Sequence, residues 1–490
     1  MGLKASGENG AKAQFKMHCA RAFRTYDTLL EARKTIGATR PQTAVLVDMN
    51  VVLMSVPNSV LTLSAFVNIV WGFVEWALGT GWLTVLVFDE PKNMTNAKRL
   101  EQARRDAARN AYAIPCSDDV DPFPYTDNYT RENLDATENV LSVRNKRSSR
   151  SRMYDEVSRR IFEMASEKAA KWNASGKEDN KTVVVLDGVD IRGCDRPAFE
   201  PRTVGMVSNN EAICESLRRQ VPIGEGDLKL QALEDRIRML AMPGQVLAGT
   251  SLVMTSTIDT DSLMISALAV SKRRANPFGA SVLSVLCMRN PASKSEKQDD
   301  PRASASYLVV DTSMLEACIL EYIYHGEIVS PAQALNTTIA LASCAALSGC
   351  DFCSLSGARF DHFFSCLQDF TRTEPLALKN FENCLSPDAS IAKKACHGLM
   401  RVCYAASAKM EGKGKRYARQ AQSVAEADDA TLRRAIWTAC YWSGNEFTAD
   451  ESFGFPTQSS SDEDDNGRGI RIPSSSANVT YQTGASVMEE

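Results

Sequence analysis

The sequence predicts an α/β protein with a central, mostly parallel, twisted sheet that is flanked by helices. Three observations predict this class. Short apolar, β-branched runs each end in an aspartate, helical stretches separate these runs, and the 490 residues can bury a large core. The composition is ordinary for a globular protein.

Five apolar runs have the pattern of buried parallel strands. They cover residues 43–48, 83–89, 182–187, 251–259 and 307–311. In a parallel sheet the C-terminal strand ends lie along one edge, so side chains just beyond them converge on one crevice. Carboxylates that are far apart in the sequence can therefore form one site.

The apolar stretch 60–83 is long enough to raise the question of a membrane span. It contains Asn68 and Glu75, and Gly79-Thr80-Gly81 interrupts it. We therefore expect a buried helix, then a turn and then a strand, and no stable membrane span.

Changes in composition divide the chain into five parts. Between residues 117 and 181 an acidic, proline-containing loop, a basic run and a charged helical stretch indicate an insertion or cap on the sheet. The Ser-, Asp-, Glu- and Gly-rich tail is expected to be disordered. The parts are the N-terminal part of the α/β domain (1–116), the cap (117–181), the C-terminal part of that domain (182–365), a helical region (366–451) and the tail (452–490).

Charge and cysteine usage favour an intracellular protein and leave its partners open. The net charge of −4 is an average over acidic stretches and basic runs, so it does not exclude nucleic acid. The fourteen cysteines are scattered and form no short disulfide framework, which favours a reducing location, nuclear or cytoplasmic. The start Met-Gly-Leu-Lys-Ala-Ser fits the N-myristoylation pattern, so a membrane-associated interaction protein is one alternative function.

Two pairs of closely spaced carboxylates carry the strongest chemical signal. Glu225 and Asp227 are separated by one glycine, immediately before a helix-like stretch. Asp259 and Asp261 have the same spacing after an apolar run. Two anions so close together need neutralising, and a hard divalent cation is the usual means.

Single carboxylates at or near the ends of other apolar runs extend this set. They are Asp48, Asp89 and Asp351. Any one of them could instead cap a helix or face solvent, but the ordered set of seven favours a site for two Mg²⁺ or Mn²⁺ ions. Two such ions about 4 Å apart can activate water, stabilise a departing oxygen and offset charge on a phosphate.

The segments around these carboxylates resemble motifs of the superfamily that contains the flap endonucleases and the Xrn-type 5′→3′ exonucleases. Segment 47–50, Val-Asp-Met-Asn, resembles the first Xrn motif, and segment 224–229, Gly-Glu-Gly-Asp-Leu-Lys, resembles Gly-Glu-Gly-Glu-His-Lys. Segment 258–264 is similar to the later Asp-x-Asp motif, and segment 347–352 to Gly-Asn-Asp-Phe. The four motifs occur in the same order as in that superfamily.

The resemblance implies a PIN-like 5′-nuclease fold and a metal-dependent nuclease that hydrolyses phosphodiester bonds of RNA or DNA. It implies that the seven carboxylates bind the metal and catalyse: Asp48, Asp89, Glu225, Asp227, Asp259, Asp261 and Asp351. It also implies that a basic segment after Asp89 binds the 5′ phosphate of a single strand. The residues of this segment are Lys98, Gln102, Arg104 and Arg105. The spacing of Lys98, Gln102 and Arg105 places them on one helical face, where they could bind a phosphate together.

Several alternatives stay open at this point. Asp187, in a Leu-Asp-Gly-Val step, competes with Asp89 as the second aspartate. The Gly-Ile-Gly turn of flap endonucleases is absent from segment 354–360, which argues against a standard flap endonuclease. The basic run 144–152 could guide a single strand or serve as a localisation signal. A nuclease-like protein that binds nucleic acid without cutting it is the second alternative function.

Overall fold

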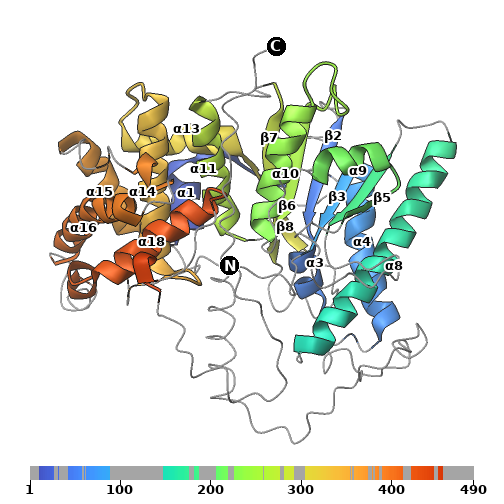
Figure 1. Ribbon diagram of the computed structural model, residues 1–490, viewed down its shortest axis with the longest axis horizontal. Helices are drawn as coiled ribbons and strands as arrows, with labels where there is room; N and C mark the ends of the chain where they lie inside the picture. Colours follow the sequence, from blue (N-terminus) through green and yellow to red (C-terminus); the bar gives the residue numbers. More distant parts are fainter. Residues whose placement is uncertain are drawn as a thin grey trace, which may run out of the picture. The chain divides into compact units, whose positions relative to one another are not determined.

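An eight-stranded mixed sheet lies at the centre of the structure, and helices flank it (Figure 1). The computed structural model describes residues 10–26, 31, 42–57, 60, 62–88, 147–175, 181–186, 206–218, 226–257, 259–275, 281–291, 304–353, 355, 358–373, 378, 381–385, 389–411, 421–445 and 451–455. All of them belong to one compact unit, Met1–Phe455.

The sheet has the strand order β1-β8-β7-β6-β2-β3-β4-β5. Strand β2 pairs in parallel with β3 and β6, and the parallel pairing continues from β3 to β4 and from β6 to β7. The outer pairings β1–β8, β7–β8 and β4–β5 are antiparallel. The strands are β1 (Phe23–Tyr26), β2 (Thr43–Asp48), β3 (Leu83–Val87), β4 (Thr182–Leu186), β5 (Met206–Ser208), β6 (Leu252–Thr257), β7 (Leu283–Pro291) and β8 (Ser304–Asp311).

The predicted α/β class is confirmed, and four predicted strands correspond to β2, β3, β4 and β6. The prediction of a parallel strand at 307–311 is wrong, because β8 runs antiparallel to both of its neighbours. A parallel neighbour requires a crossover connection, usually a helix. The polar segment 292–303, which separates β7 from β8 in the sequence, has no helical pattern to supply one.

The strand order reverses between β2 and β6. From β2 the chain continues to β3 and β4 on one side, and from β6 it continues to β7 on the other. In open α/β sheets the crevice at such a reversal receives the segments that follow the C-terminal ends of both strands. Asp48 ends β2 and Asp259 follows β6, so this topology places both carboxylates at the reversal.

Alternate residues of the central strands face two different cores, as the pleat requires. Val45 and Val47 pack with α3 (Met49–Ser55), α4 (Leu63–Thr80) and α8 (Arg147–Ala174). Ala44 and Leu46 pack with α9 (Glu211–Arg218) and α10 (Gly226–Leu240) on the opposite face. The two groups of helices are visible on the two sides of the sheet in Figure 1.

Helix α8 belongs to the layer that covers the sheet. Its buried apolar side chains recur every fourth residue and therefore lie on one helical face, packed against α4 and the strands. They are Met153, Val157, Ile161, Ala165 and Ala169. This part of the predicted cap 117–181 is thus a helix between β3 and β4, whereas residues 117–146 lie outside the described residues.

Helix α4 confirms the predicted order of a helix, a turn and a strand, and one face of this helix is buried. Phe66, Val70 and Val74 pack in the core that α4 shares with α8 and β2, and β3 begins at Leu83. Among the described residues, α4 is the one helix long and apolar enough to cross a membrane, and 39% of its 18-residue window is buried. Core helices of soluble proteins also pass this test, so it is weak support for a span.

The turn after α4 allows a first prediction. The Gly81→Ala change is expected to lower the free energy of unfolding by about 1–3 kcal/mol. A Cβ atom there would lie 2.7 Å from the Leu83 carbonyl oxygen and 2.9 Å from Val45 Cγ2. In the matched change Gly72→Ala, inside α4, the Cβ would meet no atom within 4 Å, and a gain of about 0.5–1 kcal/mol is expected. Urea unfolding measures both, and equal effects would contradict this packing of α4 beside the sheet.

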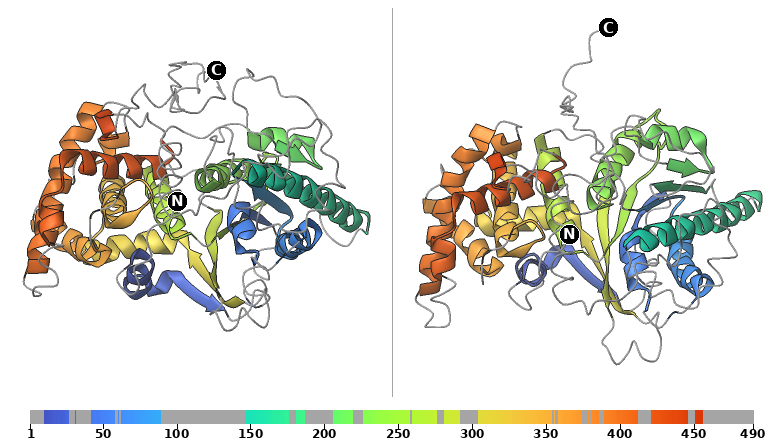
Figure 2. Two further views of the ribbon diagram at one scale, coloured as in Figure 1. Left: turned by 90° about the horizontal axis from the view of Figure 1, so that it is seen from below. Right: turned by 60° about the horizontal axis from the view of Figure 1, so that its bottom comes forward.

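The remaining helices extend the core from β7 and β8. Leu286 and Val310 of these strands share one hydrophobic cluster with Trp437 and Phe455. Figure 2 shows these helices gathered at the β7–β8 side of the sheet, away from α4 and α8. The helices are α1 (Ala11–His18), η2 (Ala20–Ala22), α11 (Asp261–Ala275), α13 (Thr312–Ile323), α14 (Pro331–Gly349), α15 (Phe360–Thr373), η4 (Glu382–Leu385), α16 (Ala389–Glu411), α18 (Asp429–Trp442) and η5 (Glu451–Phe453).

The structure bears on two of the predicted boundaries, those at residues 366 and 452. The helical region 366–451 shares its core with the second half of the sheet. Helix η5 and Phe455 pack on the same core, so the described chain continues beyond the predicted start of the tail at residue 452. Residues 456–490 lie outside the described residues.

Candidate metal centre

Asp48 ends β2 and also caps the helix that follows. Its Oδ1 accepts a hydrogen bond from the backbone N–H of Val51 at 3.3 Å. This bond satisfies an N–H group at the start of α3 and fixes the side chain at the strand end. Asp48 is only 5% exposed, so the sheet presents a buried carboxylate here.

Asp227 lies in the first turn of α10, which begins at Gly226. A carboxylate is favoured at this end of a helix, because the unpaired N–H groups give it a partial positive charge. Asp227 is 8% exposed, and its Oδ1 is buried with no hydrogen-bond partner among the described residues. Such an atom is costly unless a ligand binds it.

Asp259 and Asp261 lie at the start of α11, whose first residue is Asp261. The Asp259 backbone N–H donates to Thr257 Oγ1 at 3.2 Å, and this Oγ1 lies 3.3 Å from Ser262 Oγ. These local bonds shape the short link between β6 and α11. Asp259 is partly buried, whereas Asp261 at the helix start is fully buried.

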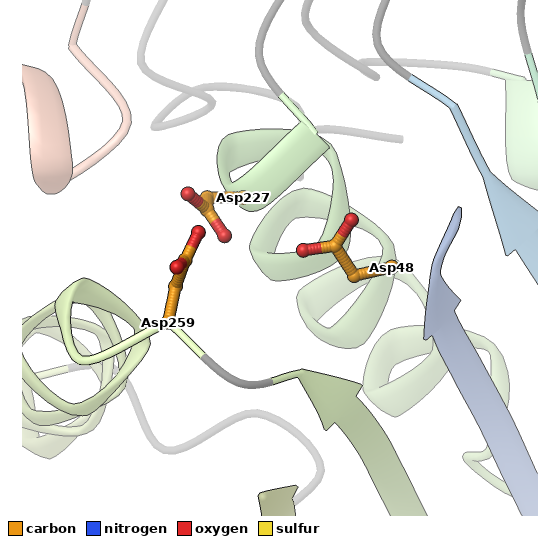
Figure 3. A group of neighbouring side chains, drawn as sticks. All are labelled: Asp48, Asp227 and Asp259. Carbon is orange, nitrogen blue, oxygen red and sulfur yellow. The ribbon is translucent and has the colours of Figure 1, made fainter. Parts of the chain in front are cut away.

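Three of these carboxylates converge. Carboxylate oxygens of Asp48, Asp227 and Asp259 all lie within 4.8 Å of one another. Figure 3 shows the three side chains directed toward a common point from the end of β2, the start of α10 and the segment after β6. Oxygens bound to one Mg²⁺ at about 2.1 Å lie roughly 3–4 Å apart, so a small closure of this group would suit one ion.

The electrostatics of the group favour a bound cation. Burial raises the pKa of the Asp227 carboxyl well above its usual range, and the negative charges of Asp259, Asp48 and Asp261 raise it further. The charged form of Asp227 is therefore unfavourable in the absence of a positive partner. A divalent cation would reverse this effect, since its charge dominates the local field.

Asp351 is brought to the same edge by a helix pair. Ser271 in the second half of α11 lies 2.6 Å from Thr338 in the first half of α14, and Asp261 at the start of α11 lies close enough to Cys350, just after α14, to raise its pKa. The two helices therefore run in opposite directions. The other end of α14 lies beside the start of α11. Burial, the Cys353 thiol and the Asp261 carboxylate together raise the pKa of the Cys350 thiol, which immediately precedes Asp351.

The structure therefore brings together part of the predicted set. Asp48, Asp227 and Asp259 form the compact group. Asp261 lies close enough to raise the pKa of Asp227, and Asp351 follows Cys350, whose pKa Asp261 also raises. Neither Asp261 nor Asp351 joins the group within 4.8 Å among the described residues. The other predicted residues lie outside the described residues. They are Asp89, its competitor Asp187, Glu225, and the basic segment Lys98, Gln102, Arg104 and Arg105.

Lys229, two residues after Asp227, is a buried residue to which the sequence analysis gave no role. It is fully buried in α10, and its Nζ donates to the Phe88 carbonyl oxygen at 3.2 Å. This bond ties α10 to the chain just after β3, one residue before Asp89. The signal in the sequence is a lysine two residues after Asp227, between Leu228 and Leu230 in a stretch with helical periodicity.

The cysteines do not contribute a second metal centre among the described residues. The twelve described cysteines form no disulfide among themselves and are all buried, including Cys350 and Cys353. The Cys353 backbone N–H donates to Cys350 Sγ at 3.3 Å, so this pair stabilises the turn that carries Asp351.

An oxygen-only donor set on buried strand and helix ends is suited to a hard cation such as Mg²⁺ or Mn²⁺. In comparisons with known proteins, no family model matches the chain and no curated protein matches it.

Proposed function

We propose that this protein is a Mg²⁺- or Mn²⁺-dependent nuclease with a PIN-like 5′-nuclease fold. One observation carries the proposal. Carboxylates of Asp48, Asp227 and Asp259, which come from three separate elements, converge within 4.8 Å where the strand order reverses. Isolated carboxylates at strand ends are common, but three that are held this close together favour neutralisation, by a proton or by a cation.

Different residues of the centre would hold the two ions. Asp48, Asp227 and Asp259 would hold the first ion, and the second would be held with the help of the remaining predicted carboxylates, Asp89, Glu225, Asp261 and Asp351. When bound, the ions supply an activated water and stabilise the charge on the phosphate and the departing oxygen. The protein contributes position: the cap on α3 holds Asp48, the first turn of α10 holds Asp227, and the bond to Thr257 holds the backbone of Asp259.

Nucleic acid is the proposed substrate because of the order of the motifs. Segments 47–50, 224–229, 258–264 and 347–352 occur in the order of the 5′-nuclease superfamily, closest to its Xrn branch. A single strand with a free 5′ end suits this assignment, which makes 5′→3′ exonuclease action the favoured mode and flap-type cleavage the second.

A cleavage assay tests the proposal. The purified chain is incubated with 5′-phosphorylated RNA, 5′-hydroxyl RNA, single-stranded DNA and a DNA flap, each with Mg²⁺, Mn²⁺ or EDTA. We expect cleavage that requires a divalent cation, and none from Asp259→Ala protein purified in the same way. Binding of these substrates without any cleavage would favour a nuclease-like binding protein instead.

The basic segment after Asp89 leads to a separate prediction. Lys98→Ala is expected to lower the preference for 5′-phosphorylated over 5′-hydroxyl RNA by about 10–100-fold, because a charge-assisted hydrogen bond to the phosphate is lost. Initial rates on the two RNAs measure this ratio. Lys92→Ala, six residues before Lys98 and outside the basic segment, is the matched control. An unchanged ratio in Lys98→Ala would remove the anchoring role and leave the metal centre untouched.

A further inference from the structure

Helices α10 and α11 both begin at the metal centre and are bonded to each other further along. Arg273, near the end of α11, donates from Nη1 to Glu234 Oε1 at 2.9 Å and to Asp235 Oδ1 at 2.6 Å, both in α10. The Arg273 side chain is 16% exposed and that of Glu234 only 4%. The bond to Glu234 is therefore largely buried, whereas the Asp235 side chain is 46% exposed, and both are charge-assisted bonds between two helices that pack together.

The other bonds of the same turn hold α11 in place on its remaining sides. Arg274 donates to both carboxylate oxygens of Glu316 in α13 at 2.6 Å, and Lys272 donates to the Ser443 carbonyl after α18 at 2.6 Å. The end of α11 is thus bonded to α13 and to the residue that follows α18. Within this turn, Arg273 makes the link to α10.

The position of this link matters for the distance between the carboxylates. Glu234 is seven residues, roughly 10 Å of helix, from Asp227 at the start of the same helix. Asp259 lies two residues before Asp261, the first residue of α11, and Arg273 lies twelve residues, roughly 18 Å of helix, after Asp261. The like charges at these two helix starts repel each other, which tends to separate them. A fixed bridge between the helices opposes that separation.

We propose that Arg273 is a positioning residue of the metal centre. Its bonds to Glu234 and Asp235 set the separation of α10 and α11, and thereby the distance between the carboxylates of Asp227 and Asp259. Arginine suits this role, because its planar guanidinium group has a rigid geometry and keeps its charge when buried. The proposal rests on the proposed function, since it assumes that these carboxylates bind a divalent cation.

A positioning role and a purely structural role predict different results. If Arg273 only stabilises the fold, its loss lowers the stability equally with and without Mn²⁺. If it positions the carboxylates, its loss weakens Mn²⁺ binding as well, and the stabilisation that Mn²⁺ gives to the folded protein shrinks. Mn²⁺ affinity is therefore the measurement that separates them.

The test is a Mn²⁺ titration of the full chain by calorimetry, with wild type, Arg273→Met, Arg273→Lys and Asp235→Asn. We expect about 10–100-fold weaker Mn²⁺ binding in Arg273→Met, as for the loss of other groups that orient metal ligands, and partial recovery in Arg273→Lys. Asp235→Asn removes the negative charge from the acceptor of one of the two bonds, which weakens that bond, and is expected to weaken Mn²⁺ binding severalfold. It keeps the proposal testable if Arg273→Met does not fold. Lys272→Met, from the same turn, is the matched control and should stay within twofold of wild type.

The outcomes distinguish a failure of the proposed function from a failure of the role proposed for Arg273. Wild-type protein that binds no Mn²⁺ would overturn the proposed function itself. Wild-type binding together with unchanged affinity in Arg273→Met, or in Asp235→Asn where Arg273→Met does not fold, would overturn only the role of Arg273. A loss of affinity in Lys272→Met as large as that in Arg273→Met would show a general loosening of α11, and would also overturn it.

Discussion

The Asp227→Asn protein is expected to lose metal-dependent cleavage and, without divalent cations, to be more stable than the wild type. Asparagine has the shape of aspartate but carries no charge, so it removes the repulsion from Asp259 and Asp48 and the cost of burying an anion. Loss of a metal ligand removes several kcal/mol of transition-state stabilisation, on the order of a 10²–10³-fold lower rate. The gain in the free energy of unfolding should be about 0.5–2 kcal/mol, as at other functional sites that trade stability for activity.

The stability difference between the wild type and Asp227→Asn should depend on pH in a defined direction. The folded protein holds a proton on Asp227 at pH values where the unfolded chain has released it, because the pKa of Asp227 is raised in the folded state. The stability of the cation-free wild type therefore falls as pH rises from the ordinary carboxyl range through the raised pKa. Asp227→Asn lacks this fall, and the two proteins converge in acid. Mn²⁺ binding to the wild type should tighten over the same window, because the cation competes with the proton.

Urea unfolding in EDTA across this pH range, with and without added Mn²⁺, measures these effects. Asp311→Asn is the matched control: Asp311 caps α13 by accepting from the Met314 N–H, away from the cluster, and asparagine caps equally well. It should change neither cleavage nor the pH dependence. An Asp227→Asn protein that is less stable than wild type in EDTA at neutral pH would contradict the repulsion argument.

The sequence was informative where local pattern and topology act together. Asp48 and Asp259 follow apolar runs that could only be buried strands, and a parallel arrangement puts such strand ends on one edge. Asp227 was predicted from its spacing to Glu225 and from the helix-like residues after it. These three residues are the group that the structure brings within 4.8 Å.

The features that the sequence did not reveal depend on distant partners. Strands β1 and β5 have only four and three residues, too few for a periodic signal, and they exist through pairing with β8 and β4. In α8 the apolar residues at every fourth position are diluted by charges on the other faces, so the helix was assigned to a cap. The link from Arg273 to Glu234 joins residues 39 apart in sequence, and both read as ordinary solvated helix charges until the helices are packed.

A second large effect is expected in the helices that share a core with β7 and β8, which we call the helical group. Trp437→Ala should lower the free energy of unfolding by about 3–5 kcal/mol, the usual cost of removing a large buried aromatic side chain. Trp437 is 1% exposed, stacks on Tyr441 at a centroid distance of 4.9 Å and meets the edges of Phe352 at 5.4 Å and Phe455 at 5.0 Å. Tyr404→Ala is the control, because this aromatic side chain of α16 is 54% exposed and its loss should cost no more than about 0.5 kcal/mol.

The form of the unfolding transition is as informative as its midpoint. Because Trp437 shares one core with Leu286 of β7 and Val310 of β8, the helical group and this side of the sheet should unfold together, and Trp437→Ala should shift a single transition. Phe352 links the same core to Asp351, so we also expect weaker Mn²⁺ binding in this variant, but by less than in Asp227→Asn. Two separate transitions, with only the helical one shifted, would show that residues 366–451 fold as a domain of their own and that the metal centre does not depend on them.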